Sequence, residues 1–312
     1  MKKIVHPCVL LLCLFTMLAA PFQAVADDNN FMRGDTDGDE QVNIKDVATL
    51  IDYLLYGEWP SVPKPDEKPE VKYYDIYDMV SFKMVKVKGG TFTMGAANEQ
   101  DTCALDNEKP AHEVTLSDYW IGEFEVTQEM WVALMMENPS WHSKRNGFVE
   151  DLQRPVEKVS WDDCQSFIAG LNSVLGTNFR LPTEAEWEFA ARGGNKSKGY
   201  LYAGSNNVDE VAWYNLTDVN GEYFSTQTVR TKQPNELGIY DMSGNVMEWC
   251  QDWYKPYTGE AQTNPTGPIV GTDHVYRGGG WTTSADKCRV TYRDGSSSKA
   301  NGIGFRLAMS AE

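Results

Sequence analysis

The sequence has few residues of the types that most often hold zinc or iron. Only four of its 312 residues are histidines and six are cysteines, and neither type clusters at metal-binding spacings. A histidine-rich iron centre or a zinc site is therefore not expected. Basic residues are also scarce, since 28 lysines and arginines stand against 45 acidic residues, for a formal net charge of −17. Such a chain is repelled by nucleic acid and by anionic membrane surfaces, and it attracts cations such as calcium.

The apolar run at the N-terminus, residues 9–20, is short for a membrane span, which needs about 20 residues. Lys2 and Lys3 precede this run, and the small residues Ala24-Val25-Ala26 follow it. This order is typical of a cleaved signal peptide. We therefore expect residues 1–26 to be removed and the chain to be exported to the periplasm, the medium or the cell surface, without membrane insertion after cleavage. The alternative is an N-terminal membrane anchor.

Cysteine is the second scarce residue with a consequence for the mature chain. Four cysteines remain after cleavage, namely Cys103, Cys164, Cys250 and Cys288. Export permits disulfides between them, and four cysteines allow three pairings. The pairing is left open by the sequence.

Composition divides the chain into four segments. The signal peptide at 1–26 is followed by a small acidic module at 27–57. Residues 58–80 contain four prolines among charged residues, which predicts a stiff, extended linker. The main domain is expected at 81–312.

The acidic module contains oxygen-bearing residues at the spacing of an EF-hand calcium loop. Two positions depart from that pattern, because Glu40 stands where the loop favours glycine and the last ligand is the shorter aspartate. A helical apolar stripe follows the loop. The segment resembles one half of a type I dockerin, and the resemblance implies a cohesin-like partner; the alternative is a solvated acidic turn before a helix. The predicted calcium ligands are Asp35, Asp37, Asp39, Gln41, Asn43 and Asp46.

The main domain has the pattern of an α+β fold with short elements and long loops. Alternation after Met84 and at 114–116 and 119–126 predicts strands. Thr127 is the expected N-cap of a helix over 128–136, and a second helix is expected over 164–175. Thr183, with Glu186 three residues on, predicts a capping box.

A series of ordered motifs in this domain resembles the formylglycine-generating-enzyme, or sulfatase-modifying-factor, superfamily. The motifs are GGTFTMG (89–95), EKPAHEVTL (108–116), EVTQ (125–128), PVEKVSW (155–161), FRLPTEAEWE (179–188), NELGIYDMSGNVMEW (235–249), RGGGW (277–281) and GIGFR (302–306). The resemblance spans about residues 81–310. It implies a variant of the C-type-lectin fold with little regular secondary structure.

Members of this family oxidise a cysteine of a sulfatase to formylglycine with oxygen and copper(I). In the family two cysteines in a Cys-x4-Cys pair hold the metal, and soft copper(I) binds thiolates strongly. In this sequence Cys288 matches the second cysteine, whereas Thr283 stands at the first. The resemblance therefore implies Cys288 as the candidate catalytic residue of an incomplete pair. Alternatives for Cys288 are a buried packing thiol and a disulfide, for instance with Cys250.

The resemblance also implies a structural calcium site in the stretch before Glu248-Trp249. It maps onto Asp241, Gly244, Val246 and Glu248. Aspartate and glutamate supply the hard oxygens that calcium prefers. The alternative is that these acids cap backbone donors.

Five further side chains have two interpretations each. Arg277 and Arg306 are expected to pair with buried acids or carbonyls rather than to bind anions in a groove. Trp249, Trp253 and Trp281 are either core anchors or the lining of a cleft for a peptide or sugar.

Two functions therefore remain open. One is a formylglycine-generating oxidase that acts on an exported sulfatase. The other is a non-catalytic C-type-lectin-like binding protein with a ligand at the cell surface.

Overall fold

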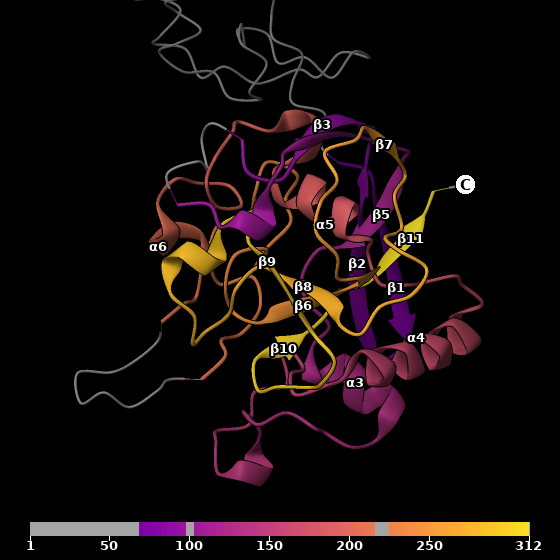
Figure 1. Ribbon diagram of the computed structural model, residues 1–312. Coiled ribbons are helices and arrows are strands. Elements are labelled where there is room, and N and C mark those ends of the chain that lie inside the picture. Colours follow the sequence, from indigo (N-terminus) through magenta and orange to yellow (C-terminus); the bar gives the residue numbers. More distant parts are fainter. Residues whose placement is uncertain (1–68, 98–102, 216–224, 312) are drawn as a thin grey trace, which may run out of the picture. The chain divides into compact units, whose positions relative to one another are not determined.

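Segments from both ends of the described chain pair in one sheet. The structure, a computed structural model, describes residues 69–97, 103–215 and 225–311. The strand order of this sheet is β1-β2-β5-β11, and all neighbours are antiparallel (Figure 1). The strands are Val71–Ile76, Val80–Val87, Tyr119–Gly122 and Ala308–Ser310. The C-terminal strand β11 therefore packs in the same sheet as the first strands of the domain.

Strand β1 changes the predicted boundary of the domain. Residues 71–80 were expected in the extended linker, but they form β1 and the turn into β2. The physical reason is that Ile76 and Val80 are buried at the two sides of this turn, so the hairpin contributes to the core. The signal peptide, the acidic module with Asp35 to Asp46, and residues 58–68 lie outside the described residues.

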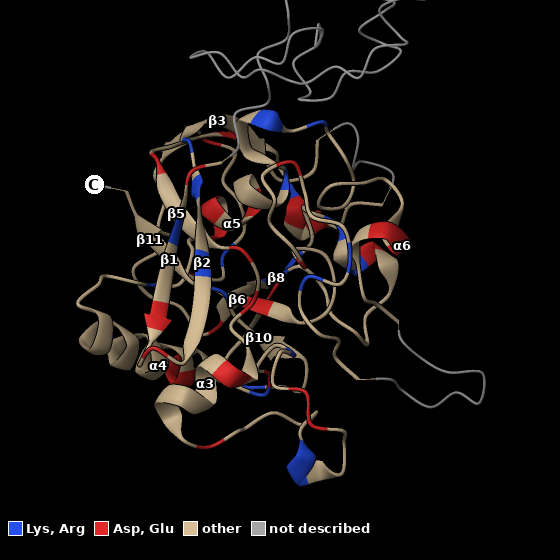
Figure 2. Cartoon of the chain, turned by 180° about the vertical axis from the view of Figure 1, so that it is seen from behind, with Lys and Arg blue, Asp and Glu red and all other residues tan. Residues whose placement is uncertain are grey.

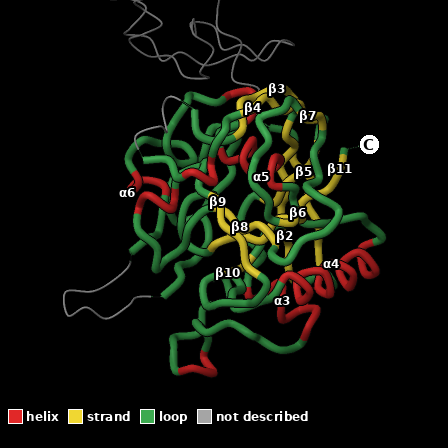
Figure 3. The backbone as a smooth tube through the Cα atoms, viewed as in Figure 1, coloured by secondary structure: helices red, strands yellow, loops and turns green. Residues whose placement is uncertain are grey.

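The remaining strands form two further sheets. The second sheet has the order β10-β6-β8-β9, and the third has the order β3-β4-β7. The strands of the second are Ile303–Gly304, Met247–Trp253, His274–Arg277 and Arg293–Ser296. Those of the third are Gly90–Met94, His112–Leu116 and Gln262–Thr263. Figure 3 shows that long loops connect these short strands, as the α+β prediction requires.

The helices begin at the predicted caps. The threonine hydroxyl of Thr127 accepts from Met130 at the start of α3 (Gln128–Met135), and Thr183 forms a capping box with Glu186 at α5 (Glu184–Ala191). Helix α4 (Trp161–Leu175) starts three residues earlier than expected, because Ser160 is its N-cap. The remaining helical turns are α6 (Val208–Val211), η1 (Asp106–Glu108), η2 (Lys144–Asn146), η3 (Gly194–Lys196) and η4 (Ala285–Cys288).

Two hydrophobic clusters form the core. One lies between the first sheet and helices α3 and α4, which cover its lower end in Figure 1. The other surrounds α5, which contacts strands of the second and third sheets. All eight residues of α5 are buried, including Glu184, Glu186 and Glu188. Figure 2 shows acidic positions, in red, on α5 in the middle of the domain. Buried carboxylates need partners, and these partners organise the site.

Among the described residues, none of the helices combines the length and the apolar character required to cross a bilayer.

Candidate functional site

The loop between β8 and β9 holds the residues that the sequence singled out for catalysis. It begins with Gly278 and Gly279, whose φ angles are 94° and 67°. A Cβ atom at Gly279 would lie 2.7 Å from the carbonyl oxygen of Lys287 and 2.9 Å from the Cys288 sulfur. Only glycine permits this approach. The glycine pair therefore folds the start of the loop against its end.

This folding brings Thr283 and Cys288 side by side. The Thr283 hydroxyl lies 3.9 Å from the Cys288 sulfur. The same hydroxyl donates to the carbonyl of Gly280 and accepts from its N–H, both at 2.9 Å. The two positions of the family's cysteine pair thus meet in space, with a hydroxyl at the first of them.

The environment of Cys288 keeps its thiol neutral. Its side chain is fully buried. Burial raises the pKa of this thiol to about 12, although the hydrogen bond with Thr283 acts in the opposite direction. A protonated thiol and a hydroxyl do not fit copper(I), which prefers thiolate ligands. The residues present at this position therefore do not form the family's copper site.

The disulfide alternative is not realised in the structure. Among the described residues, the four cysteines form no disulfide, and Cys164, Cys250 and Cys288 are buried. Burial also raises the pKa of the Cys250 thiol. Cys288 therefore matches the buried packing thiol that was one of its three readings.

A buried histidine packs beside this loop, and the sequence analysis did not identify it. The ring of His142 contacts Trp281 edge to face, with 4.5 Å between centroids. Its Nδ1 atom lies 3.5 Å from a carboxylate oxygen of Glu157, which also accepts the His142 backbone N–H at 2.9 Å. Trp281 is itself 7% exposed. It is therefore a core anchor of the loop itself.

The stretch predicted to hold calcium contains three residues with positive φ, namely Asp241, Gly244 and Asn245. A Cβ atom at Gly244 would lie 2.5 Å from the carbonyl oxygen of Trp213, so glycine is required there. The carboxylate of Asp241 is buried, and its Oδ2 atom accepts the backbone N–H of Arg230 at 2.7 Å. Its Oδ1 atom has no hydrogen-bond partner. Asp241 thus retains one buried oxygen for a further ligand.

Glu248 is occupied in a different way. Its two oxygens accept from Nη2 and Nε of Arg306, both at 2.6 Å, and Oε2 also accepts the indole N–H of Trp187 at 2.7 Å. This bidentate pair uses the directions from which a cation would bind. In the present side-chain positions Glu248 does not fit the role of a calcium ligand.

Glu125 is a buried acid that the sequence analysis quoted only as part of a motif. It is fully buried, and neither carboxylate oxygen has a hydrogen-bond partner. Burial raises its pKa well above the usual value, and the charges of Asp241 and Glu248 raise it further. The pKa of Asp241 is raised to about 6, chiefly by burial. Neither the EVTQ motif nor the 241–248 stretch alone predicts that the charges of Asp241 and Glu248 act on Glu125.

These groups form what we call the Glu125–Asp241 centre, with Glu248 and Arg306 beside it. The three carboxylates face the guanidinium of Arg306, and the charge of Arg230 also acts on Asp241, so negative charge is in excess when all three acids are ionised. A divalent cation or bound protons would balance it. Asp241 and Glu125 have unpartnered carboxylate oxygens, the type of ligand that calcium prefers. Within the described residues, however, no three His, Cys, Asp or Glu side chains lie together as a ready metal site. The carbonyl contributions of Gly244 and Val246 stay a prediction.

Several buried acids, Glu248 among them, have arginine partners instead. Glu188 pairs with Arg277, and Glu248 pairs with Arg306, so the structural reading of both arginines is confirmed. The other two pairs are Arg289 with Glu108 and Arg293 with Glu184, each at 2.6 Å. The pairs of Arg289, Arg293 and Arg306 are bidentate, and the four pairs together tie η1, α5 and β6 to the C-terminal part of the chain.

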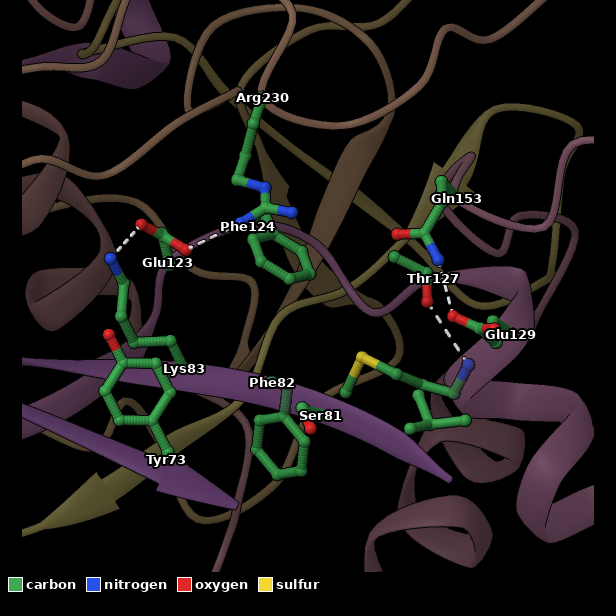
Figure 4. A pocket seen from close by; sticks show the side chains of 12 residues that line it. Tyr73, Ser81, Phe82, Lys83, Glu123, Phe124, Thr127, Glu129, Gln153 and Arg230 are labelled. Atoms are coloured by element: carbon green, nitrogen blue, oxygen red, sulfur yellow. Dashed lines mark hydrogen bonds and ion pairs between the residues drawn. The ribbon is translucent and has the colours of Figure 1, made fainter. Parts of the chain in front are cut away.

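Figure 4 shows a pocket of about 290 Å³ on the first sheet, between β2 and the start of α3. Glu123 bridges Lys83 and Arg230 on one wall, and Gln153 donates to Glu129 on the other. Phe82, Phe124 and Met130 form the apolar part of its lining. The charged groups on its walls already pair with each other, so this pocket presents little unbalanced charge to a ligand.

Comparisons with known proteins agree with this architecture. Residues 79–311 match the sulfatase-modifying factor enzyme 1-like domain. The chain is similar to the chaperone protein LppX of Paenibacillus barcinonensis, at 35% identity over 72% of this chain and 87% of that protein. It is similar to the formylglycine-generating enzyme of Streptomyces coelicolor, at 29% identity over 72% of this chain and 89% of that enzyme. Among solved structures, Treponema denticola variable protein 1 superposes with a TM-score of 0.66 at 31% identity, over 78% of this chain and all of that one.

Proposed function

The chain belongs to the family of sulfatase-modifying factor enzyme 1-like domains, and we propose that within this family it is an exported binding protein without formylglycine-generating activity. The observation that carries the proposal is the contact between Thr283 and Cys288. Their side chains lie 3.9 Å apart, where the family resemblance calls for two cysteines. A hydroxyl is a poor ligand for copper(I), so the pair lacks the chemistry that the oxidation requires.

The state of Cys288 supports the same proposal. A catalytic thiol must be accessible and must ionise, because the thiolate is the reactive and metal-binding form. The Cys288 thiol is fully buried, and its pKa is raised to about 12. It therefore stays protonated at neutral pH.

A binding role needs a partner, and the comparisons suggest its class. The relative at 35% identity is named a chaperone protein, and a chaperone acts by binding another protein. We therefore propose a protein or peptide partner outside the cytoplasm. A sulfatase would be such a partner if the chain bound it without modifying it. A cohesin-like partner would concern the acidic module, through the loop from Asp35 to Asp46.

Calcium would serve this protein as a structural ion. We propose that the Glu125–Asp241 centre holds it, with Asp241 and Glu125 as the carboxylate ligands. Support comes from their unpartnered buried oxygens and from burial and neighbouring carboxylates, which raise the pKa of Glu125. The ion would neutralise the carboxylates and fix the 241–248 turn, which leads into β6. A second calcium is proposed for the loop of the acidic module.

The test is an oxidation assay on the mature chain. It is incubated with copper(I), oxygen and a Cys-x-Pro-x-Arg peptide, and the peptide is examined by mass spectrometry for the aldehyde. We expect no conversion. Conversion at a rate comparable with that of the Streptomyces coelicolor enzyme, run in parallel, would refute the proposal.

A matched variant makes a negative result informative. Thr283→Cys restores the second thiol next to Cys288 at a position where a side chain of similar size already fits. We expect this variant to compete for copper(I) with a chromogenic chelator, whereas the unmodified chain and Cys288→Ala do not. Equal copper retention by the unmodified chain and by Thr283→Cys would contradict the assignment of residue 283.

A further inference from the structure

A second pocket, of about 480 Å³, lies between β6, the first turn of α5 and the loops that flank β7. Its volume is in the range of known ligand sites. None of the residues that line it belongs to the loop with Thr283 and Cys288. Its apolar lining includes Met94, Trp253, Pro256, Tyr257, Pro265 and Pro268. We call it the Asp252 pocket, after the acid described next.

Asp252 is the polar group that distinguishes this pocket. Its side chain lines the pocket and is only 5% exposed. Its Oδ2 atom accepts the backbone N–H of Glu184 at 2.9 Å. No described residue donates a hydrogen bond to its Oδ1 atom. Burial raises the pKa of Asp252 to about 7, and the charge of Glu184 adds to the rise. A nearly buried carboxylate with one unpartnered oxygen favours a ligand that donates a hydrogen bond or carries positive charge.

The buried arginine and glutamate of the pocket already pair with each other. Arg293 donates to both oxygens of Glu184, and its guanidinium lies between the rings of Tyr254 and Tyr257, 4.6 and 4.1 Å from their centroids. The Tyr257 hydroxyl donates to Glu184 at 3.2 Å, which fixes that wall. Lys255 also lines the pocket, but it is exposed to solvent. Asp252 is therefore the buried charge that a ligand would complement.

Two glycines hold the loop after β7 against the floor of the pocket. A Cβ atom at Gly267 would lie 2.8 Å from Cβ of Asp252, and one at Gly271 would lie 2.7 Å from Cβ of Trp253. Between these two contacts, Ile269 is 96% exposed and Val270 is 74% exposed. These two exposed aliphatic residues directly follow Pro268, which lines the pocket, and we call them the Ile269–Val270 lip. Covering such a lip favours a partner with apolar surface of its own.

We propose that the Asp252 pocket binds a bulky apolar side chain and a neighbouring ammonium or guanidinium group of a protein partner, with the Ile269–Val270 lip covered by the same partner. The apolar group packs on Trp253, Tyr257 and the prolines, and the cation pairs with Asp252. A basic partner also suits a chain with a formal net charge of −17. This inference rests on the proposed binding function and names the chemistry of its partner.

The experiment is a titration of the mature chain labelled with 5-fluorotryptophan, followed by fluorine NMR. The Trp253 resonance is assigned by its loss in Trp253→Phe. The probes are 2-phenylethylammonium, the neutral 2-phenylethanol, the anionic 3-phenylpropionate and a methyl glucoside. We expect saturable shifts of the Trp253 resonance with the ammonium probe, at an affinity about tenfold or more above that of the alcohol, because a charged hydrogen bond is lost in the neutral probe.

Variants separate the roles of the pocket and the lip. Asp252→Asn retains an oxygen acceptor for Glu184 and should remove the preference for the ammonium probe. Glu129→Gln, in the pocket of Figure 4, removes an acid elsewhere and should leave the preference unchanged. Ile269→Ser with Val270→Ser should weaken binding of a Phe-Lys-containing octapeptide severalfold and leave the small ammonium probe unaffected.

Several results would overturn the inference. Equal affinities for ammonium and alcohol in the unmodified chain would do so without any variant, as would binding of the glucoside but not the amine. A preference for the ammonium that survives in folded Asp252→Asn would also do so. These outcomes are separate from the oxidation assay, because aldehyde formation there would refute the proposed function whatever this titration shows.

Discussion

Two groups of buried carboxylates lie within the same domain and have different surroundings. Glu108, Glu184, Glu188 and Glu248 each pair with an arginine. Glu125, Asp241 and Asp252 are buried without an arginine partner. In the first group the arginine offsets the cost of burial, and the pKa values of Glu108 and Glu184 are lowered. In the second group burial raises the pKa values.

The difference separates architecture from binding. An acid with a bidentate arginine has its hydrogen bonds satisfied and offers a ligand little. A buried acid with an oxygen that lacks a hydrogen-bond partner destabilises the fold, unless a proton, a cation or a partner group neutralises its charge. We therefore assign the arginine pairs to fold stability, and the Glu125–Asp241 centre and the Asp252 pocket to ligands.

The largest expected effect comes from breaking an arginine pair. Arg306→Met leaves Glu248 buried without its partner and should lower the free energy of unfolding by about 3–5 kcal/mol. Denaturant unfolding of the mature chain measures this loss. The double variant Arg306→Met with Glu248→Gln removes the stranded charge and retains an acceptor for Trp187, so its loss should be smaller. An equal loss in both variants would contradict the electrostatic account of the pair.

Replacing Asp252 is expected to stabilise the chain, in contrast to Arg306→Met, and the size of this gain should depend on pH. Its pKa is raised from 3.8 to about 7, so the stability that it contributes is present below pH 4 and is lost as the pH rises through 7. Glu184, Glu186 and Arg293 are the charged groups that influence it. Asp252→Asn should therefore stabilise the chain at pH 8 by about 1–4 kcal/mol relative to its effect at pH 4. A variant that is less stable at pH 8 than at pH 4, relative to the parent chain, would have the wrong sign.

A smaller effect is expected at Glu125. In the presence of a chelator at pH 8, Glu125→Gln removes one of the carboxylates that repel each other and should raise the melting temperature. Added calcium should stabilise the parent chain by about 2–3 kcal/mol at a hundredfold excess over the dissociation constant, and the variant much less. Thermal unfolding with and without calcium measures both. Glu129→Gln is the matched control, because Glu129 lies in the pocket of Figure 4 and already accepts from Gln153.

Local sequence signals predicted much of the fold. Thr127 and Thr183 cap α3 and α5 as expected, because capping depends on residues three positions apart. The start of the domain was missed, because proline and charge near residues 60–69 obscured the hairpin of β1 and β2. That hairpin is stabilised by burial of Ile76 and Val80, which only the packed domain shows.

The candidate sites were less accessible to sequence reasoning. The motif around residue 283 placed Thr283 and Cys288 together, and the structure brings them into contact. Glu248 pairs with Arg306, 58 positions away, and the charge of Asp241 raises the pKa of Glu125, 116 positions away. No local pattern encodes such contacts, so the motif at 241–248 predicted Glu248 as a calcium ligand without showing its arginine, and left Glu125 unassigned.

The most direct test of the distinction between paired and unpaired acids is the number of calcium ions bound. Isothermal titration of the mature chain should detect a calcium site that is lost in Asp241→Asn and retained in Asp162→Asn, which removes an acid from the exposed start of α4. Any site in the loop from Asp35 to Asp46 is common to all three proteins and does not affect the comparison. We predict one site fewer in Asp241→Asn. Identical stoichiometry and affinity in the parent chain and Asp241→Asn would contradict the account.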